Sequence, residues 1–188
     1  MIGSLWVLIP TYVANASATL PKGWGPRMDL GRKWKDGSPI LGSSKSWSGF
    51  VAGSVIGLIV GLMQEMLVLV APPSLQIVPL FSDSLLLSVP VLIALTFGAM
   101  TGDALGSFVK RRMGFQSGGR APLLDQLPFV LLPMALVLVL SPPLFVAAFW
   151  PGLTLGLFTL AWIILLTLVL HAGFNWVGYF AGLKRVPW

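Results

Sequence analysis

The residues best suited to chemistry lie in GDALGSFVKRR (102–112), a stretch that begins inside an apolar segment and ends in a basic loop. If it stays helical, Asp103, Ser107 and Lys110 fall on one face, because their spacing is i, i+4, i+7. A carboxylate, a hydroxyl and an ammonium in one stripe could form a site for phosphate and a metal ion. The alternative is an ordinary end of a membrane span, whose long polar side chains extend to the interface.

A second carboxylate, Asp125, precedes another apolar segment in RAPLLDQLPF (120–129). It could cap the following helix, or it could join Asp103 in one pocket. Aspartates among many basic residues fit a phosphate site where a cation offsets the repulsion, and Mg²⁺ is commonly held by one or two carboxylates plus substrate phosphates. The chain has no Cys and 1 His, which excludes a thiolate nucleophile and the common zinc sites. Any metal here must be bound mainly by oxygen ligands, which favours Mg²⁺, Mn²⁺ or Ca²⁺, and its candidate ligands are Asp103 and Asp125.

Three further polar residues are expected at the same depth in the membrane. His171 and Asn175 are spaced i, i+4 near the end of the last apolar segment, and Asn15 ends the first one. Together with Asp103 and Asp125 they lie at one depth, although they come from four different helices. Scattered polar residues would not be expected to converge in this way. We infer a shared cavity, although His171 alone could be a hydrogen-bonded packing residue.

The loop sequence DLGRKWKDGSPILGSSKSWSG (29–49) is rich in glycine and serine around Lys45. Backbone N–H groups and hydroxyls of this kind can hold phosphate oxygens, so Lys45 and Ser46 are candidate phosphate ligands. The spacing is not that of a P-loop. By itself the loop is therefore weak evidence for a phosphate site.

The composition predicts a membrane protein. Of 188 residues, 56% are hydrophobic and 10% are charged, too few charges to cover a soluble surface. The apolar runs approach or exceed the roughly 18 residues needed to cross a bilayer. We expect one all-α domain, residues 1–188, with about five transmembrane helices. These helices are expected at about 1–18, 48–71, 84–108, 128–147 and 151–178.

The basic residues predict the orientation of these helices. All Lys and Arg fall in the loops at about 19–47 and 109–127 or in the C-terminal tail. The positive-inside rule then places the N-terminus outside and the C-terminus, with both basic loops, in the cytoplasm. The net charge of +6 thus reflects membrane topology and attraction to anionic lipids rather than nucleic-acid binding.

Two features of the second apolar segment allow more than one interpretation. Gly49, Gly53, Gly57 and Gly61 line one helix face, which suits close helix packing within the chain, a homodimer interface or a groove for a lipid chain. Glu65 lies in the outer half of that segment. It could pair with a nearby polar group or have a function, since carboxylates inside a membrane are costly.

The ordered set of motifs resembles the CDP-archaeol synthases of archaea, distant relatives of the phosphatidate cytidylyltransferases. The similar elements are PTYVAN (10–15), DLGR (29–32), DGSPILG (36–42), SKSWSG (44–49), GDALGSFVKRR (102–112), LLDQLPF (123–129), HAGFN (171–175) and GLKRVPW (182–188). They span nearly the whole chain. The wider cytidylyltransferase pattern often has a second acid after the aspartate, whereas Gln126 follows Asp125 here, so a two-metal arrangement is less well supported.

The resemblance implies a reaction in which CTP and 2,3-bis-O-geranylgeranylglycerol 1-phosphate give CDP-archaeol and pyrophosphate, with Mg²⁺ required. Each candidate residue then has an expected role. Mg²⁺ would be held by Asp103 and Asp125; the phosphates would be neutralised by Lys45, Lys110 and Arg111; the pocket would be lined by Asn15, His171 and Asn175. The isoprenoid tails would lie between helices, and the site would face the cytoplasm, where CTP is found.

Other functions remain open from sequence. A CDP-alcohol phosphotransferase needs four clustered aspartates, and this chain has two candidates. A glycerol-phosphate acyltransferase would need a Gly-Ser-Gly-Asn type of loop, which is absent. A small transporter would place polar residues near the bilayer midplane, often in repeated halves, and no repeat is visible. A membrane scaffold, or a cytidylyltransferase for another lipid phosphate, also remains possible.

Overall fold

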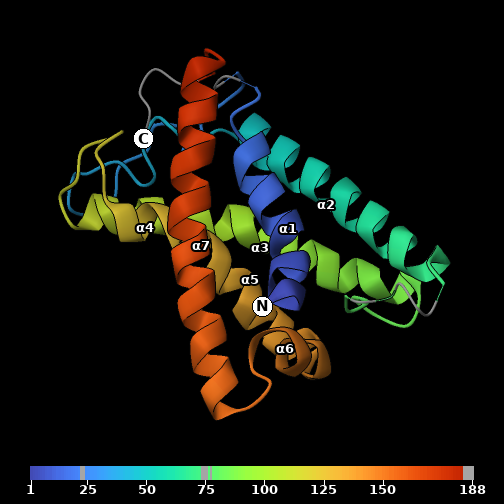
Figure 1. The fold of residues 1–188 in the computed structure, drawn as a ribbon. Coiled ribbons are helices and arrows are strands. Elements are labelled where there is room, and N and C mark those ends of the chain that lie inside the picture. The colour runs from blue at the N-terminus through green and yellow to red at the C-terminus, as the bar shows by residue number, and fades with distance from the viewer. Residues whose placement is uncertain (22–23, 73–75, 77, 184–188) are drawn as a thin grey trace.

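The computed structural model describes residues 1–21, 24–72, 76 and 78–183, and all regular elements in that part are helices (Figure 1). The helices are α1 (Ile2–Ser17), α2 (Trp47–Val70), α3 (Leu85–Arg112), α4 (Pro122–Gln126), α5 (Pro128–Leu140), α6 (Pro142–Phe149) and α7 (Leu153–Phe180). The described residues contain only isolated bridges and no strand. The expected all-α class is therefore confirmed.

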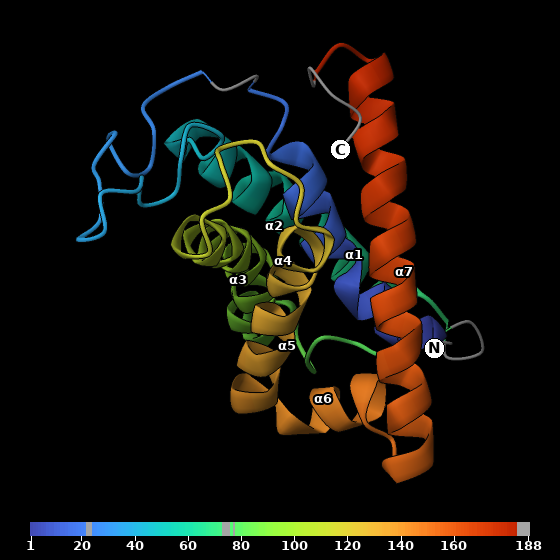
Figure 2. The same ribbon diagram turned by 90° about the vertical axis from the view of Figure 1, so that its left-hand side faces the viewer.

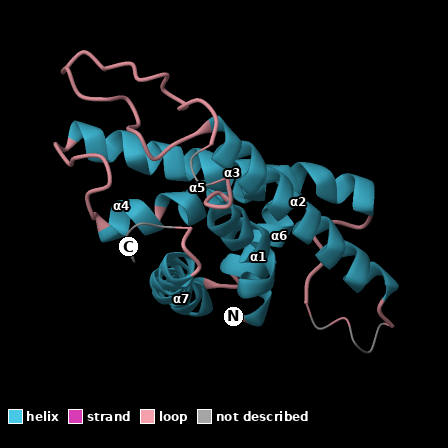
Figure 3. Cartoon of the chain, turned by 90° about the horizontal axis from the view of Figure 1, so that it is seen from above, coloured by secondary structure: helices cyan, strands magenta, loops and turns pink. Residues whose placement is uncertain are grey.

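Helix α3 lies at the centre of the bundle and packs against α1, α2 and α5 (Figure 2). The main core joins α1, α3 and α5 through fully buried side chains such as Leu8, Leu92 and Val137. Helix α7 runs alongside and contacts α1, α4 and α6, and from above it is seen end-on at the edge of the bundle (Figure 3). One side of α7 is thus left open to the surroundings.

The glycine face of α2 packs within the chain. A Cβ atom on Gly57 would lie 2.7 Å from the carbonyl oxygen of Pro10 in α1, and one on Gly61 would lie 2.6 Å from a methyl group of Leu92 in α3. Any larger residue would push the helices apart. Close packing within the chain therefore accounts for this spacing.

A second glycine pair brings α4 and α5 onto α3. A Cβ atom on Gly102 would overlap the carbonyl oxygen of Pro128, and one on Gly106 would overlap the carbonyl oxygen of Leu124. Since Asp103 neighbours Gly102 and Asp125 neighbours Leu124, this close approach also brings the two carboxylates toward one another. This close approach was not predicted from the sequence.

Two predicted boundaries are wrong. The segment 128–147 is not one helix but α5 and α6, because Ser141 leaves helical geometry (φ −144°, ψ 73°) and Pro142 starts a new helix. A proline fits the first turn of a helix, because its missing N–H needs no partner there. The segment 109–127 is not wholly a loop, since α3 continues to Arg112 and α4 lies within it.

Three helices, α2, α3 and α7, are long and apolar enough to cross a membrane, and α5 is a shorter apolar helix. The chain is thus embedded in the membrane, while five crossings and their orientation stay predictions.

Glu65 is fully buried at the opposite end of α2 from Lys45, where it accepts hydrogen bonds from the amides of Phe81 and Ser82 and from the hydroxyl of Ser88. It thereby holds Phe81 and Ser82, just before α3, against the end of α2.

Candidate active site

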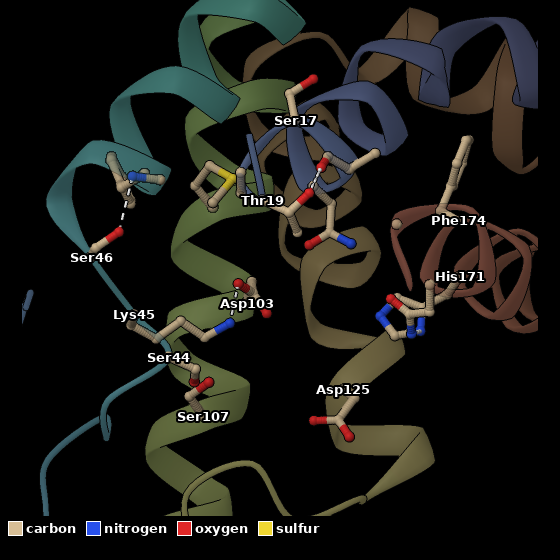
Figure 4. Close-up of a pocket in the computed structure, with 18 of the residues that line it drawn as sticks. Ser17, Thr19, Ser44, Lys45, Ser46, Asp103, Ser107, Asp125, His171 and Phe174 are labelled. Carbon is tan, nitrogen blue, oxygen red and sulfur yellow. Dashed lines mark hydrogen bonds and ion pairs between the residues drawn. The ribbon is translucent and has the colours of Figure 1, made fainter. Parts of the chain in front are cut away.

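One cavity of about 440 Å³ lies where α1, α3, α4 and α7 meet the loop before α2 (Figure 4). It is lined by every candidate site residue from the sequence: Asn15, Lys45, Ser46, Asp103, Ser107, Lys110, Arg111, Asp125, His171 and Asn175. The expectation of a shared cavity is confirmed. The functional roles of these residues are separate proposals.

The α3 stripe forms as its spacing predicts, because α3 stays helical to Arg112. Asp103, Ser107 and Lys110 all face the cavity. Lys110 is only 6% exposed, so its ammonium must be compensated by partners rather than by water. This burial argues against the alternative of a merely interfacial helix end.

Each cavity carboxylate is paired with one lysine. Lys45 binds Asp103, and the two point toward each other in Figure 4. Lys110 Nζ lies 2.5 Å from Asp125 Oδ1 and donates a 2.6 Å hydrogen bond to the carbonyl of Gly119. The cavity therefore contains two carboxylate–lysine ion pairs, and the guanidinium of Arg111 adds one further positive charge.

Asp125 does not cap the helix at 128, as one alternative proposed. Its second oxygen, Oδ2, accepts a 2.9 Å hydrogen bond from the amide of Ala121, the residue before α4. Asp125 thus satisfies the start of its own short helix with one oxygen and binds Lys110 with the other.

The loop that carries Lys45 is organised by Asp29. Its carboxylate accepts hydrogen bonds from the amides of Gly31, Leu41 and Gly42 at 2.9–3.0 Å. Burial raises the pKa of Asp29, but these donors and the charge of Arg27 outweigh it, so the pKa lies below its ordinary value. After Lys45, the Ser46 hydroxyl caps α2 by accepting from Gly49 N. The loop is therefore tied at both its middle and its end.

The opposite wall comes from α1 and α7. The rings of His171 and Phe129 lie 6.0 Å apart, and His171 Nδ1 lies 3.1 Å from Asn175 Nδ2. His171 is thus a hydrogen-bonded packing residue that also faces the cavity.

Arg111, on α3, is 4% exposed and donates to the carbonyl of Phe115 at 2.7 Å. These contacts hold both side chains in place at the cavity wall.

Comparison with known proteins agrees with this geometry. The CarS-like CDP-archaeol synthase family matches residues 1–188. This chain belongs to that family. CDP-archaeol synthases of Thermococcus gammatolerans and Archaeoglobus fulgidus are 37% and 36% identical over 188 residues, all of this chain and 96% and 98% of theirs. The synthase of Methanospirillum hungatei is 39% identical over 181 residues, 96% of this chain and 100% of its own.

A solved structure of an intramembrane enzyme for archaeal membrane lipid biosynthesis has a similar fold. The TM-score is 0.64 and the sequence identity 29%, with 90% of this chain and 92% of the other covered. For this CDP-archaeol synthase family member, the match supports a membrane-embedded enzyme and the helical arrangement described above.

The donor set of this family member suits Mg²⁺. Among the residues that the structure describes, no three His, Asp or Glu side chains group together as a complete metal cage. Mg²⁺ does not require one, because it is usually bound by one or two carboxylates and completed by phosphates and water. Asp103 and Asp125, which face one cavity, meet that requirement.

The sequence analysis of this family member missed part of the cavity. Ser44, Gly118, Gly119 and Thr19 also line it. Gly119 matters most, since its carbonyl is an acceptor for Lys110. The Gly-Gly pair beside Arg120 was the available signal, because adjacent glycines in a basic loop permit close backbone approach to a ligand.

Proposed function

We propose that this chain transfers the cytidylyl group of CTP to 2,3-bis-O-geranylgeranylglycerol 1-phosphate, giving CDP-archaeol and pyrophosphate. The family match over the full chain supports the reaction. The observation that carries it is the single cavity in which two carboxylates, two lysines and neutral polar groups face one another. Its volume of about 440 Å³ lies in the range of small-molecule sites.

The chemistry needs no general base. The lipid phosphate has a second pKa of about 6 and is largely ionised at neutral pH. One of its oxygens attacks the α-phosphorus of CTP, the bond from that phosphorus to the bridging β-oxygen breaks, and pyrophosphate leaves. The barrier lies in bringing two anions together, so positioning and cationic groups supply most of the catalysis.

The ion pairs suggest how the cavity prepares for CTP. Asp103 and Asp125 would hold Mg²⁺, which neutralises phosphate charge when bound. Lys45 and Lys110 would then leave their carboxylate partners and bind phosphate oxygens, with Arg111 adding a third positive charge. Since the cavity pairs these charges with one another, its lysines are not buried without a partner.

The neutral polar groups would position the nucleotide and the acceptor. Asn15, His171 and Asn175 lie on the α1 and α7 walls of the cavity, and their uncharged polar groups suit the uncharged parts of CTP. Ser46 and Ser107 carry hydroxyls that can donate to phosphate oxygens. The tails of the lipid would lie along the apolar helix surfaces.

The proposed orientation follows from where CTP is found. We place the cavity at the cytoplasmic face, the N-terminus outside and the C-terminus inside, with α1, α2, α3, the α5–α6 pair and α7 as five crossings. The concentration of Lys and Arg in the two loops beside the cavity supports this orientation. A homodimer of this chain stays a prediction.

Release of pyrophosphate from γ-labelled CTP tests the function. Purified protein with Mg²⁺ and the geranylgeranyl ether lipid phosphate should release it, and Asp103→Asn and Asp125→Asn should not. Asp83→Asn is the matched control, because Asp83 is exposed at the far end of α3. Release with phosphatidic acid but not with the geranylgeranyl ether lipid phosphate would indicate a different lipid specificity. No release with any lipid phosphate would contradict the proposal and favour a transporter or a scaffold.

A further inference from the structure

The two loops beside the cavity are joined to each other, and Arg112 is central to the junction. Arg112 ends α3, two residues after Lys110, and its Nη2 donates to the carbonyl of Pro39 at 2.5 Å. Its Nη1 lies 3.3 Å from Asp36 Oδ1. Both partners belong to the loop between α1 and α2, which Figure 3 shows alongside one end of α3.

Aromatic rings enclose the same guanidinium. Its central carbon lies 5.8 Å from the ring centre of Trp34 and 5.0 Å from that of Phe108, and the two rings meet edge to face at 5.3 Å. A single surface ion pair contributes little. A planar guanidinium that combines a carbonyl, a carboxylate and two rings is a stronger junction, and Lys cannot reproduce it.

A second contact joins the loops nearer the cavity. The hydroxyls of Ser43 and Ser117 lie 2.9 Å apart, and Ser43 N donates to Ser117 Oγ at 3.1 Å. Gly42 makes this possible, because it adopts φ +96° and a Cβ there would lie 2.9 Å from Ser117 Oγ. We call Asp36, Pro39, Ser43, Arg112 and Ser117 together the loop clasp.

In each of the two loops, a residue of the loop clasp is followed directly by residues that line the cavity. Ser44 and Lys45 come after Ser43, and Gly118 and Gly119 come after Ser117. Lys45 binds Asp103, and Gly119 accepts from Lys110. The positions of both cavity lysines therefore depend on where the clasp holds two short segments, 44–45 and 118–119.

We propose that Arg112 is a positioning residue, which acts through the loop clasp to hold Lys45 and the Gly118–Gly119 arm against the phosphates of the nucleotide. This proposal rests on the proposed function for the identity of the nucleotide. It assigns Arg112 no contact with CTP. The clasp stays closed during turnover.

The test uses the absence of cysteine from the chain. A Ser43→Cys/Ser117→Cys variant contains only two thiols, and both positions are exposed and adjacent. Oxidation should join them, and PEG-maleimide labelling measures the fraction joined. Arg112→Ala in this background should slow the joining. This readout needs no activity.

Binding and kinetics then separate positioning from direct contact. Arg112→Ala should raise the Kd and the KM for CTP by about tenfold or more, because small displacements of binding groups have large effects. Arg112→Lys should not restore them. Oxidised Arg112→Ala/Ser43→Cys/Ser117→Cys should return close to the values of the wild type, and reduction should abolish the rescue. Lys35→Ala, which removes an exposed charge from the same loop, should change neither constant.

Three results would overturn the proposal. A raised Kd that persists in the oxidised triple variant would mean that Arg112 binds CTP itself. Loss of turnover on oxidation of the double variant would mean that the loops must separate. Full rescue by Arg112→Lys would mean that charge alone matters.

Wild type that binds CTP but releases no pyrophosphate would refute the proposed function instead, while the Kd and labelling measurements would still decide on the clasp.

Discussion

Lys110 on α3 and Asp125 on α4 form an ion pair of 2.5 Å, and each makes a second hydrogen bond to the backbone of the chain around residues 119–121. The pair therefore fastens α4 and its preceding loop to α3. The same two residues are the proposed ligands of phosphate and Mg²⁺. Structural and functional roles overlap here, which gives the two cavity aspartates different expected phenotypes.

Asp125→Asn and Asp103→Asn should both lower activity, and Asp125→Asn should lower stability more. The reason is that Asp125 uses one oxygen for Lys110 and the other for the Ala121 amide, whereas Asn has one acceptor oxygen and can keep only one of these contacts, a loss of about 1 kcal/mol. Thermal unfolding in detergent, measured beside pyrophosphate release, separates the two effects. Equal unfolding temperatures for the two variants would show that the Ala121 contact contributes nothing.

Lys110→Ala should reduce kcat by about a hundredfold or more, the usual loss when one group that stabilises transition-state charge is removed. It should also destabilise the protein, because Asp125 loses its partner. Lys33→Ala is the control, since Lys33 is exposed in the other basic loop. Comparable kinetics in the two variants would refute a role for Lys110 at the phosphates.

Gly102→Ala and Gly106→Ala should each destabilise the protein by about 1–3 kcal/mol, because the new methyl group overlaps the backbone of α4 and α5. Both should also impair activity by moving Asp125 away from α3. Gly173→Ala in α7 is the matched control, since a Cβ there meets nothing within 4 Å. Thermal unfolding and kinetics of the three variants provide the measurement. A loss in Gly173→Ala as large as in the other two would contradict this explanation.

The loop around Asp29 should be stable at neutral pH and should loosen in acid. The pKa of Asp29 is lower in the folded protein than in the unfolded chain. Its contribution is therefore fully present above the unfolded value of about 4, and it is lost as the pH falls through the lower folded value. Hydrogen exchange of the Gly31, Leu41 and Gly42 amides, corrected for intrinsic rates, measures this. Asp29→Asn should lose protection already at pH 7.

Mg²⁺ should bind together with CTP rather than alone. Two carboxylates already paired with lysines form a weak site until phosphate oxygens complete it. Thermal unfolding should therefore shift with Mg²⁺ and CTP together, and much less with either one. A chelator should abolish turnover, and added Mg²⁺ should restore it. A large shift with Mg²⁺ alone would indicate a preformed metal site and contradict this prediction.

The helices and the catalytic stripe could be predicted from the sequence because both depend on local spacing. Apolar runs placed α1, α2, α3 and α7 within a few residues, and the i, i+4, i+7 spacing put Asp103, Ser107 and Lys110 on one face. The convergence of Asn15, Asp103, Asp125, His171 and Asn175 in one cavity followed from their common depth. Depth in a membrane is encoded along the chain, since the bilayer fixes where each helix begins and ends.

Only the tertiary structure decided which charges are paired and how the loops are held. Lys45 binds Asp103 across 58 residues of chain, and Arg112 reaches Pro39 across 73. Neither spacing follows from helix periodicity, because these contacts depend on how far apart the helices pack. For the pair of Lys110 and Asp125, the distance is set by Gly102 and Gly106, whose missing side chains let α4 and α5 approach α3. The sequence determined the residues available for chemistry, and helix packing determined their partners.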